Sequence, residues 1–354
     1  MLAATWIPQL VVTVLGGVFA DRLPRHLVMV GSNVLSGAAQ AGIAVLLLTG
    51  RAQLWHLIVL QVVRGVAMSF FWPASQGLIP QTIRPDLLQA ANALLGMTRN
   101  STAIVGAALG GAFVAAAGPG WALAFDAATY LASAAVLAAM RLPRAERVAE
   151  PNVVGELAEG WSEFTSRTWL WTVVVAAAIG NMVWLGGTQV LGPLVAKQSL
   201  GGAAAWGVIV ACQGVGLLVG GLLMLRVRPR RPLLFGMAMF IPAALPLVFL
   251  ASVRSTAVIA TGYLINGIAL EIFNVAWATA LQQNVPLEIL SRVSAYDMIG
   301  SLVFAPVGLA VAGPTADALG LRETLWLGAA LATASTLAGL AVRDVRELRA
   351  TDTG

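Results

Sequence analysis

Ionisable side chains within long apolar stretches are the groups in this sequence with the clearest capacity for chemistry. Arg64 and Glu271 both lie near the middle of such stretches, where a charge inside a bilayer costs at least about 2.5–3.5 kcal/mol. We predict that Glu271 takes up a proton and that Arg64 contacts an anion or pairs with a carboxylate. A static ion pair between Arg64 and Glu271 is the structural alternative.

Several amide side chains and one aromatic ring lie in the same apolar stretches as Arg64 and Glu271 or in a third stretch, and together they form candidate binding faces. Residues three, four or seven positions apart share one face of a helix, and polar side chains occur at these spacings. Such faces suit a cavity for bulky amphipathic compounds, although tryptophans in membrane helices also serve as packing residues or interface anchors. The candidate residues are Gln61, Arg64, Asn181, Trp184, Glu271 and Asn274.

Three further charges in apolar stretches are predicted to be structural. Asp126 lies toward one end of its stretch and is expected to be a hydrogen-bonding acid. Arg99 and Asp297 lie nearer the ends of theirs, where an arginine can extend to the interface and an aspartate can act in the first turn of a helix. We expect Arg99 and Asp297 to support a gate rather than to contact a substrate.

The composition indicates an integral membrane protein. The 354 residues are 58% hydrophobic and only 10% charged, whereas an ordinary soluble domain has roughly 25% charged residues. The mean hydropathy is +0.84, and the basic residues lie between apolar stretches, which excludes a nucleic-acid-binding protein. The single cysteine, Cys212, provides neither a disulfide nor a cysteine cluster. We therefore expect no metal and no cofactor.

Eleven apolar stretches are long enough to cross a bilayer as helices. Their predicted ranges are 2–20, 27–49, 54–79, 90–117, 121–140, 169–196, 203–225, 233–251, 255–281, 292–316 and 321–342. One alternate set of connections, together with the C-terminal tail, carries fifteen arginines, whereas the other set carries three arginines and one lysine. Because cytoplasmic loops carry the basic excess, we predict a multi-pass cell membrane protein with a cytoplasmic C-terminus.

Two pairs of similar segments indicate an internal repeat. LGGVFADRLPR at 15–25 aligns with VGGLLMLRVRPR at 219–230, and QTIRPDLLQAANA at 81–93 aligns with QNVPLEILSRVSA at 283–295. The repeat predicts two parallel helical bundles, with five spans in the first and six in the second. We therefore expect that the first bundle lacks its leading helix.

The repeat also divides the chain into domains. We predict an N-terminal bundle at 1–140, a cytoplasmic linker at 141–168, a C-terminal bundle at 169–342 and a cytoplasmic tail at 343–354. The linker combines an apolar face with several glutamates, which predicts an amphipathic helix on the cytoplasmic membrane surface. A solvated linker is the alternative.

A charged turn, GGVFADRLPRH at 16–26, joins the first two predicted spans. Its glycines allow another backbone to approach closely. Asp21 suits the start of a helix, where the dipole favours a carboxylate. Arg22 and Arg25 can pair with a neighbouring helix or with lipid phosphates. A turn whose arginines only hold the loop inside is the simpler interpretation.

The charged turn resembles the signature G-x-L-x-D-R-x-G-R-R of the major facilitator superfamily, with Pro24 for its second glycine and His26 for its last base. Further segments extend the resemblance over nearly the whole chain, toward the drug and siderophore exporters that include enterobactin and macrolide efflux proteins. These segments are FFWPASQGLIPQ at 70–81, ANALLGMTRNSTAIVGAALGG at 91–111 and AFDAATYLASA at 124–134. The resemblance implies a gate latch between two bundles, formed by Gly17, Asp21, Arg22 and Arg25.

Two other signatures of the superfamily are altered. The antiporter motif G-x-x-x-G-P-x-x-G-G lacks its first glycine and its proline, so the resemblance supports export more firmly than antiport. The remaining glycines, Gly106, Gly110 and Gly111, are expected to pack a neighbouring helix tightly. The arginine position of the helix 4 motif holds Gln61, and Arg64 stands one turn later. In the superfamily, helices 1, 4, 7 and 10 line a central cavity, and Arg64 and Glu271 fall in the equivalents of helices 4 and 10.

The sequence shows no sign of an enzyme, since its only lysine, Lys197, lies outside any phosphate-binding loop. The resemblance implies the all-helical major facilitator fold and a secondary transporter, a proton-coupled exporter of drug-like or siderophore-like molecules that works by alternating access. Expected partners are a small-molecule substrate, protons and membrane lipids, with no nucleic acid and with a monomeric chain. A facilitator or importer of another solute, a membrane-embedded enzyme and a non-transporting accessory or truncated protein are the alternatives.

Overall fold

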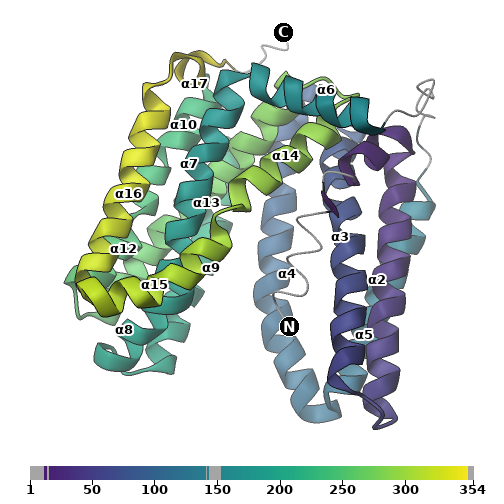
Figure 1. Ribbon diagram of the computed structural model, residues 1–354, viewed down its shortest axis with the longest axis horizontal. Coiled ribbons are helices and arrows are strands. Elements are labelled where there is room, and N and C mark those ends of the chain that lie inside the picture. The colour runs from purple at the N-terminus through teal and green to yellow at the C-terminus, as the bar shows by residue number, and fades with distance from the viewer. Residues whose placement is uncertain (1–11, 14–15, 141, 143–152, 350–354) are drawn as a thin grey trace. The chain divides into compact units, whose positions relative to one another are not determined.

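A computed structural model describes residues 12–13, 16–140, 142 and 153–349, and every regular element among them is a helix (Figure 1). Ten helical segments of this part are long and apolar enough to cross a membrane. They are Arg25–Leu48, Leu54–Thr82, Pro85–Ala117, Pro119–Ala138, Thr168–Ser199, Ala203–Arg226, Pro232–Ser252, Thr256–Asn284, Leu290–Leu319 and Leu321–Ala341. These segments correspond to the last ten predicted spans. The first predicted span, 2–20, falls largely outside the described residues.

The described residues group into two compact units. The first unit draws on Met1–Arg84, Val105–Phe164 and Asn284–Tyr296, and the second on Pro85–Ile104, Thr165–Gln283 and Asp297–Gly354. Four helices therefore contribute residues to both units, namely α4 (Leu88–Ala117), α14 (Leu290–Leu302) and, by their last one or two residues only, α6 (Val153–Ser166) and α13 (Thr256–Asn284). The grouping rests on contacts between residues, and the predicted division into bundles at 1–140 and 169–342 stays a prediction.

In the first unit, α2 (Arg25–Leu48) packs against α3 (Leu54–Thr82) and α5 (Pro119–Ala138) (Figure 1). A small residue makes the contact with α5 close, because a Cβ atom at Gly37 would lie 3.2 Å from Tyr130 Cβ. The unit also contains α6 (Val153–Ser166). Large side chains such as Val136, which is 69% exposed, cover the outside of these helices, as expected for a surface in contact with lipid.

In the second unit, α7 (Thr168–Leu185) packs against α15 (Ala305–Leu319) and α16 (Leu321–Ala341). Small residues again set the distance, since a Cβ atom at Gly186 would lie 2.7 Å from the carbonyl oxygen of Gly308. The other elements of this unit are η1 (Pro85–Leu87), α8 (Gly192–Ser199), α9 (Ala203–Arg226), α10 (Pro232–Ala238), α11 (Phe240–Ala243), α12 (Leu245–Ser252), α13 (Thr256–Asn284) and α17 (Arg343–Glu347).

Three spans that contribute to the second unit are interrupted, one of them at Val303 and Phe304 between α14 and α15. A π-helical segment, η2 (Gly186–Leu191), lies between α7 and α8, next to Pro193 in the first turn of α8. The span of α10, α11 and α12 contains Pro242 and Pro246, and a proline cannot donate a backbone hydrogen bond to the preceding turn. Such interruptions in membrane helices free backbone carbonyls, which need other partners.

Candidate functional site

Asp21 lies at the centre of a buried charged cluster in the first unit. Its Oδ1 accepts a hydrogen bond from Arg25 Nη2 at 2.8 Å, and its Oδ2 accepts from Arg292 Nε at 3.1 Å and from the Arg292 backbone N–H at 3.2 Å. The side chain is 4% exposed. Burial raises the pKa of Asp21, and the charges of Arg25 and Arg292 oppose the rise.

Arg25 ties the charged turn to two other parts of the first unit. Its Nη1 donates to the carbonyl oxygen of Gly77 at 2.9 Å, its Nε donates to Ser291 Oγ at 3.2 Å, and its Nη2 also donates to the carbonyl oxygen of Leu287. A Cβ atom at Gly77 would overlap this guanidinium group. The packing therefore requires glycine at position 77, because a larger residue would displace the Arg25 side chain from its hydrogen-bond acceptors.

Gly17 allows a second close approach. A Cβ atom at this position would lie 2.9 Å from the carbonyl oxygen of Ser291 and 3.0 Å from Arg292 Cα. The predicted motif residues Gly17, Asp21 and Arg25 thus all contact the segment around 287–292. Sequence analysis did not identify Arg292 as their partner, although Arg292 lies in the segment 283–295 that aligns with 81–93.

Helix α6 completes the cluster, and sequence analysis missed this role. Glu156 accepts from Arg22 Nη2 at 2.8 Å, and Glu159 accepts from Arg292 Nη1 at 2.7 Å. The hydroxyl of Tyr296 donates to the carbonyl oxygen of Leu157 at 2.9 Å. The acidic side of α6 therefore binds the charged turn and the start of α14. The membrane-surface position predicted for this linker stays a prediction, and most of 141–152 lies outside the described residues.

We call Asp21, Arg22, Arg25, Glu156 and Arg292 the Asp21 cluster. Its three arginines and two acids carry a net charge of +1, and Glu159 at its edge is 62% exposed. Each carboxylate has at least one guanidinium partner within 3.1 Å. Paired buried charges of this kind hold segments in one arrangement, because removal of a partner leaves the other charge buried and uncompensated.

Arg64 and Gln61 lie together in the first unit, as predicted. Arg64 Nη1 donates to Gln61 Oε1, and Nη2 donates to the hydroxyl of Tyr130, both at 3.4 Å. The guanidinium carbon lies 6.0 Å from the centre of the Tyr130 ring, within the range of a cation–π contact. Its Nε is buried without a hydrogen-bond partner among the described residues. Tyr130 was not among the predicted site residues.

Glu271 is a buried carboxylate on α13 in the second unit, with its side chain only 3% exposed. Its Oε2 accepts from Asn100 Nδ2 at 3.0 Å, whereas Oε1 has no hydrogen-bond partner among the described residues. Gly96 provides the space, since a Cβ atom there would overlap Oε1. The positive charge of Arg99 also acts on this carboxylate. Asn274, which was predicted to share a stripe with Glu271, is exposed, and its side chain also interacts with this carboxylate.

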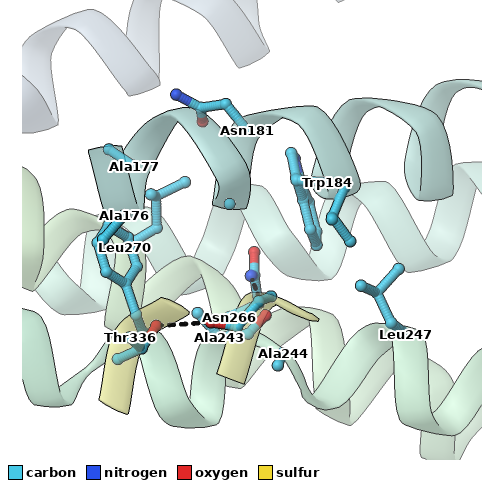
Figure 2. A pocket seen from close by; sticks show the side chains of 14 residues that line it. Ala176, Ala177, Asn181, Trp184, Ala243, Ala244, Leu247, Asn266, Leu270 and Thr336 are labelled. Carbon is cyan, nitrogen blue, oxygen red and sulfur yellow. Dashed lines mark hydrogen bonds between the residues drawn. The ribbon is translucent and has the colours of Figure 1, made fainter. Parts of the chain in front are cut away.

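A cavity of about 80 Å³ in the second unit lies beside Trp184 and Asn181 of α7. Figure 2 shows Trp184 extending toward Asn266 of α13, while the amide of Asn181 points away from Asn266. Asn181 instead donates to the carbonyl oxygen of Ser301 at 2.9 Å. The other polar residue of the lining is Thr336, and no lining residue among those described is charged.

The interrupted span forms one wall of this cavity. Asn266 Nδ2 donates to the carbonyl oxygen of Ala243 at 2.7 Å, and Leu247, four residues after Ala243, donates to Ala244 instead. Gln213 in turn donates to Asn266 Oδ1 at 2.9 Å. An amide from α13 thus satisfies a carbonyl that the break has freed. Sequence analysis did not select Asn266 and Gln213, because their role depends on a break in a neighbouring helix that the sequence pattern did not predict.

The remaining predicted residues lie apart from these groups. Asp126 Oδ2 accepts from Gln40 Nε2 at 2.6 Å, the type of contact expected for a structural acid. No described residue lies within 4 Å of a Cβ atom built at Gly106, Gly110 or Gly111. The packing partner expected for this glycine face is therefore not found in the described part of the chain.

Comparisons with known proteins agree with these observations. The Multidrug efflux pump Tap of Mycolicibacterium fortuitum is 28% identical over 339 residues, which cover 90% of this chain and 80% of that protein. Macrolide efflux protein A of Streptococcus pyogenes is 20% identical, over 94% of this chain and 84% of its own. An uncharacterized MFS-type transporter of Bacillus subtilis, YvqJ, is 24% identical, over 93% and 79% respectively.

Solved transporters share the fold. The human organic anion transporter MFSD10 superposes with a TM-score of 0.77 at 15% identity, over 95% of this chain and 82% of that one. A bacterial homologue of the iron transporter ferroportin gives 0.74 at 16% identity, over 95% and 88%. The sequence model of the Major Facilitator Superfamily matches residues 1–308. With its membrane helices and its fold, the chain belongs to the major facilitator superfamily of transporters.

Proposed function

We propose that this transporter exports drug-like or siderophore-like small molecules in exchange for protons, by alternating access. The multidrug and macrolide efflux pumps among its relatives support the export of drug-like compounds. The observation that carries proton exchange is the Glu271 carboxylate, which lies buried within an apolar span and is hydrogen-bonded by one amide. A membrane acid of this kind is costly to keep and is a candidate proton relay.

The Asp21 cluster acts in this proposal as the latch that closes the cytoplasmic side. Its support is the buried ion pair between Asp21 and Arg292 and the hydrogen bond from Arg25 to the carbonyl oxygen of Leu287, which join the charged turn to residues 287–292. Breaking a buried pair costs about 3–5 kcal/mol when one partner is left uncompensated. Opening must therefore be offset by binding of the substrate or the proton, and this requirement couples the two events.

Substrate contact in this proposal falls on uncharged and aromatic surfaces. The cavity beside Trp184 has a volume of about 80 Å³, below the roughly 300–1,000 Å³ of known small-molecule pockets, so in this conformation it admits one group of a substrate and not a whole drug-sized molecule. Its mostly apolar lining suits an apolar substituent of a drug-like compound. The exposed amide of Asn274 offers a hydrogen bond to a polar substituent.

Transport into inverted membrane vesicles with an imposed pH gradient tests the proposal. A macrolide should accumulate when the interior is acidic, and a protonophore should abolish the accumulation. Glu271→Gln keeps the shape of the side chain but removes its proton site, so it should abolish gradient-driven accumulation while substrate binding persists. The matched control is Glu347→Gln, an exposed glutamate paired with Arg343, which should transport normally.

Two results would refute parts of the proposal. Accumulation that ignores the gradient and tolerates Glu271→Gln would show that Glu271 carries no coupled proton and would favour a facilitator. Failure of the wild-type protein to move any of a panel of macrolides, dyes and siderophores would remove the export function itself.

A further inference from the structure

Besides Glu271 and Asp126, Asp297 is a carboxylate within a membrane span whose hydrogen-bond partners among the described residues are neutral. Asp297 of α14 is half-buried, in the candidate span Leu290–Leu319. Its Oδ2 accepts a hydrogen bond from Trp277 Nε1 at 3.0 Å, and its Oδ1 accepts from Ser301 Oγ at 3.2 Å. Sequence analysis assigned Asp297 to a structural gate at a helix end, but its observed contacts differ from those of the Asp21 cluster.

The charged residues on the helices that pack near Asp297 do not pair with it. Helix α7 has no charged residue along its length, and α13 has only Glu271. On α14, Arg292 pairs with Asp21 and Glu159, and the Tyr296 hydroxyl donates to a backbone carbonyl. An anion at position 297 is therefore stabilised by two neutral donors, an indole and a hydroxyl.

The indole of Trp277 is fixed by its neighbours. Trp169 packs against it edge to face with ring centres 5.7 Å apart, and Phe273 stacks on it at 6.2 Å. The ring therefore keeps its N–H directed at one carboxylate oxygen. An indole N–H can only donate, so this bond is available to both the charged and the protonated acid at Oδ2.

Ser301 treats the other oxygen differently. A hydroxyl can donate or accept, so Ser301 Oγ can donate to the ionised Oδ1 and can accept from the protonated Oδ1–H after rotation of its hydrogen. A proton that binds the Oδ1 lone pair forms an O–H bond and changes the charge of the group from −1 to 0. Both charge states then keep two hydrogen bonds without movement of a helix.

From this arrangement we infer that Asp297 is a second proton-binding residue of the transport cycle, with Trp277 and Ser301 as its positioning residues. The inference rests on the proposed proton exchange. Glu271 lies six residues before Trp277 on α13, about 9 Å along the helix axis. Asp297 is the more accessible of the two acids, since Glu271 is only 3% exposed.

Infrared difference spectroscopy of the full chain in lipid tests proton binding without any need for transport. The parent for this experiment is Glu271→Gln, which removes the other proposed proton site. In it, acidification should still produce the carbonyl band of a protonated carboxylic acid in a nonpolar site. Asp297→Asn should remove this band, whereas Asp126→Asn, which alters another membrane aspartate with a neutral amide donor, should retain it. A band that survives Asp297→Asn unchanged would overturn the inference.

Variants of the two positioning residues keep the carboxylate and supply a second measurement. Ser301→Ala and Trp277→Phe each remove a hydrogen bond that is stronger to the carboxylate anion than to the protonated acid. The band should therefore persist at proton concentrations about tenfold lower than in the parent protein. A purely structural role for either residue would leave the titration unmoved. Because the spectrum does not depend on transport, loss of the band in Asp297→Asn would hold even if the proposed export failed.

Discussion

Asp21 and Asp297 place the same side chain in opposite surroundings. Asp21 accepts hydrogen bonds from two guanidinium groups in the first unit, and Asp297 accepts from an indole and a hydroxyl in the second unit. A guanidinium keeps its charge at any physiological pH, so the pairs of Asp21 last until the geometry changes. A hydroxyl can reverse its role, so Asp297 can change charge while the geometry persists. The hydrogen-bond partners of a carboxylate thus decide whether it holds two segments together or can take up and release a proton.

The largest expected effect is on the lock. Arg25→Met keeps most of the side-chain length but leaves buried Asp21 with Arg292 alone, so the free energy of unfolding should fall by about 3–5 kcal/mol. Burial raises the pKa of Asp21, and loss of a counter-charge raises it further. The folded variant therefore binds a proton more readily than its unfolded chain, and its deficit in stability should shrink as the pH falls. Denaturation of purified protein at several pH values measures both effects.

A deficit that stayed constant with pH would contradict this account of the lock. It would mean that the loss of stability came from the hydrogen bonds of Arg25 to Gly77 and Leu287 rather than from the unpaired charge of Asp21. Asp297→Asn leaves no buried charge without its partner, because the hydrogen-bond donors to Asp297 are neutral. It should therefore change the free energy of unfolding much less than Arg25→Met.

A smaller loss of stability is expected when the close backbone contact of Gly17 in the Asp21 cluster is disturbed. Gly17→Ala places a methyl group 2.9 Å from the carbonyl oxygen of Ser291, so the free energy of unfolding should fall by about 1–3 kcal/mol. Gly31→Ala is the matched control, because no atom lies within 4 Å of the added Cβ. Thermal unfolding of the two variants should separate them, and equal values would remove the close approach from the argument.

The smallest effects should come from α6. The Glu156 side chain is 18% exposed and bonds Arg22 through both carboxylate oxygens, whereas that of Glu159 is 62% exposed. Glu156→Gln should cost about 1.5 kcal/mol or more, and Glu159→Gln less than about 1 kcal/mol. Denaturation at low and high salt measures the difference, since screening weakens the exposed pair more. The reverse order would exclude Glu156 as the main anchor of α6.

The sequence predicted the membrane spans well because hydrophobic length is a local property. Ten of the eleven ranges have a corresponding helical segment, and the family inferred from the charged turn is confirmed. The turn itself could be recognised because its glycines and charges lie within 11 residues. Gln61 and Arg64 were also brought together correctly, since one helical turn separates them.

Partners far apart in the chain could not be predicted in the same way. Arg292 lies 271 residues from Asp21, and Glu156 lies 134 residues from Arg22. A pattern of residue types shows that α6 has an acidic side but does not say which arginines face it. Asp297 was assigned by its distance from a helix end, whereas its surroundings depend on Trp277 of another helix.

By itself, then, the sequence determined that this protein lies in a lipid bilayer, which segments cross it and where charged residues lie within them. Each of these follows from the free energy of moving side chains from water into lipid. Tertiary structure alone decided which acids meet guanidinium groups and which meet neutral donors. That choice depends on hydrogen-bond distances of about 3 Å between helices, and residues from distant parts of the chain reach them only after the helices have packed.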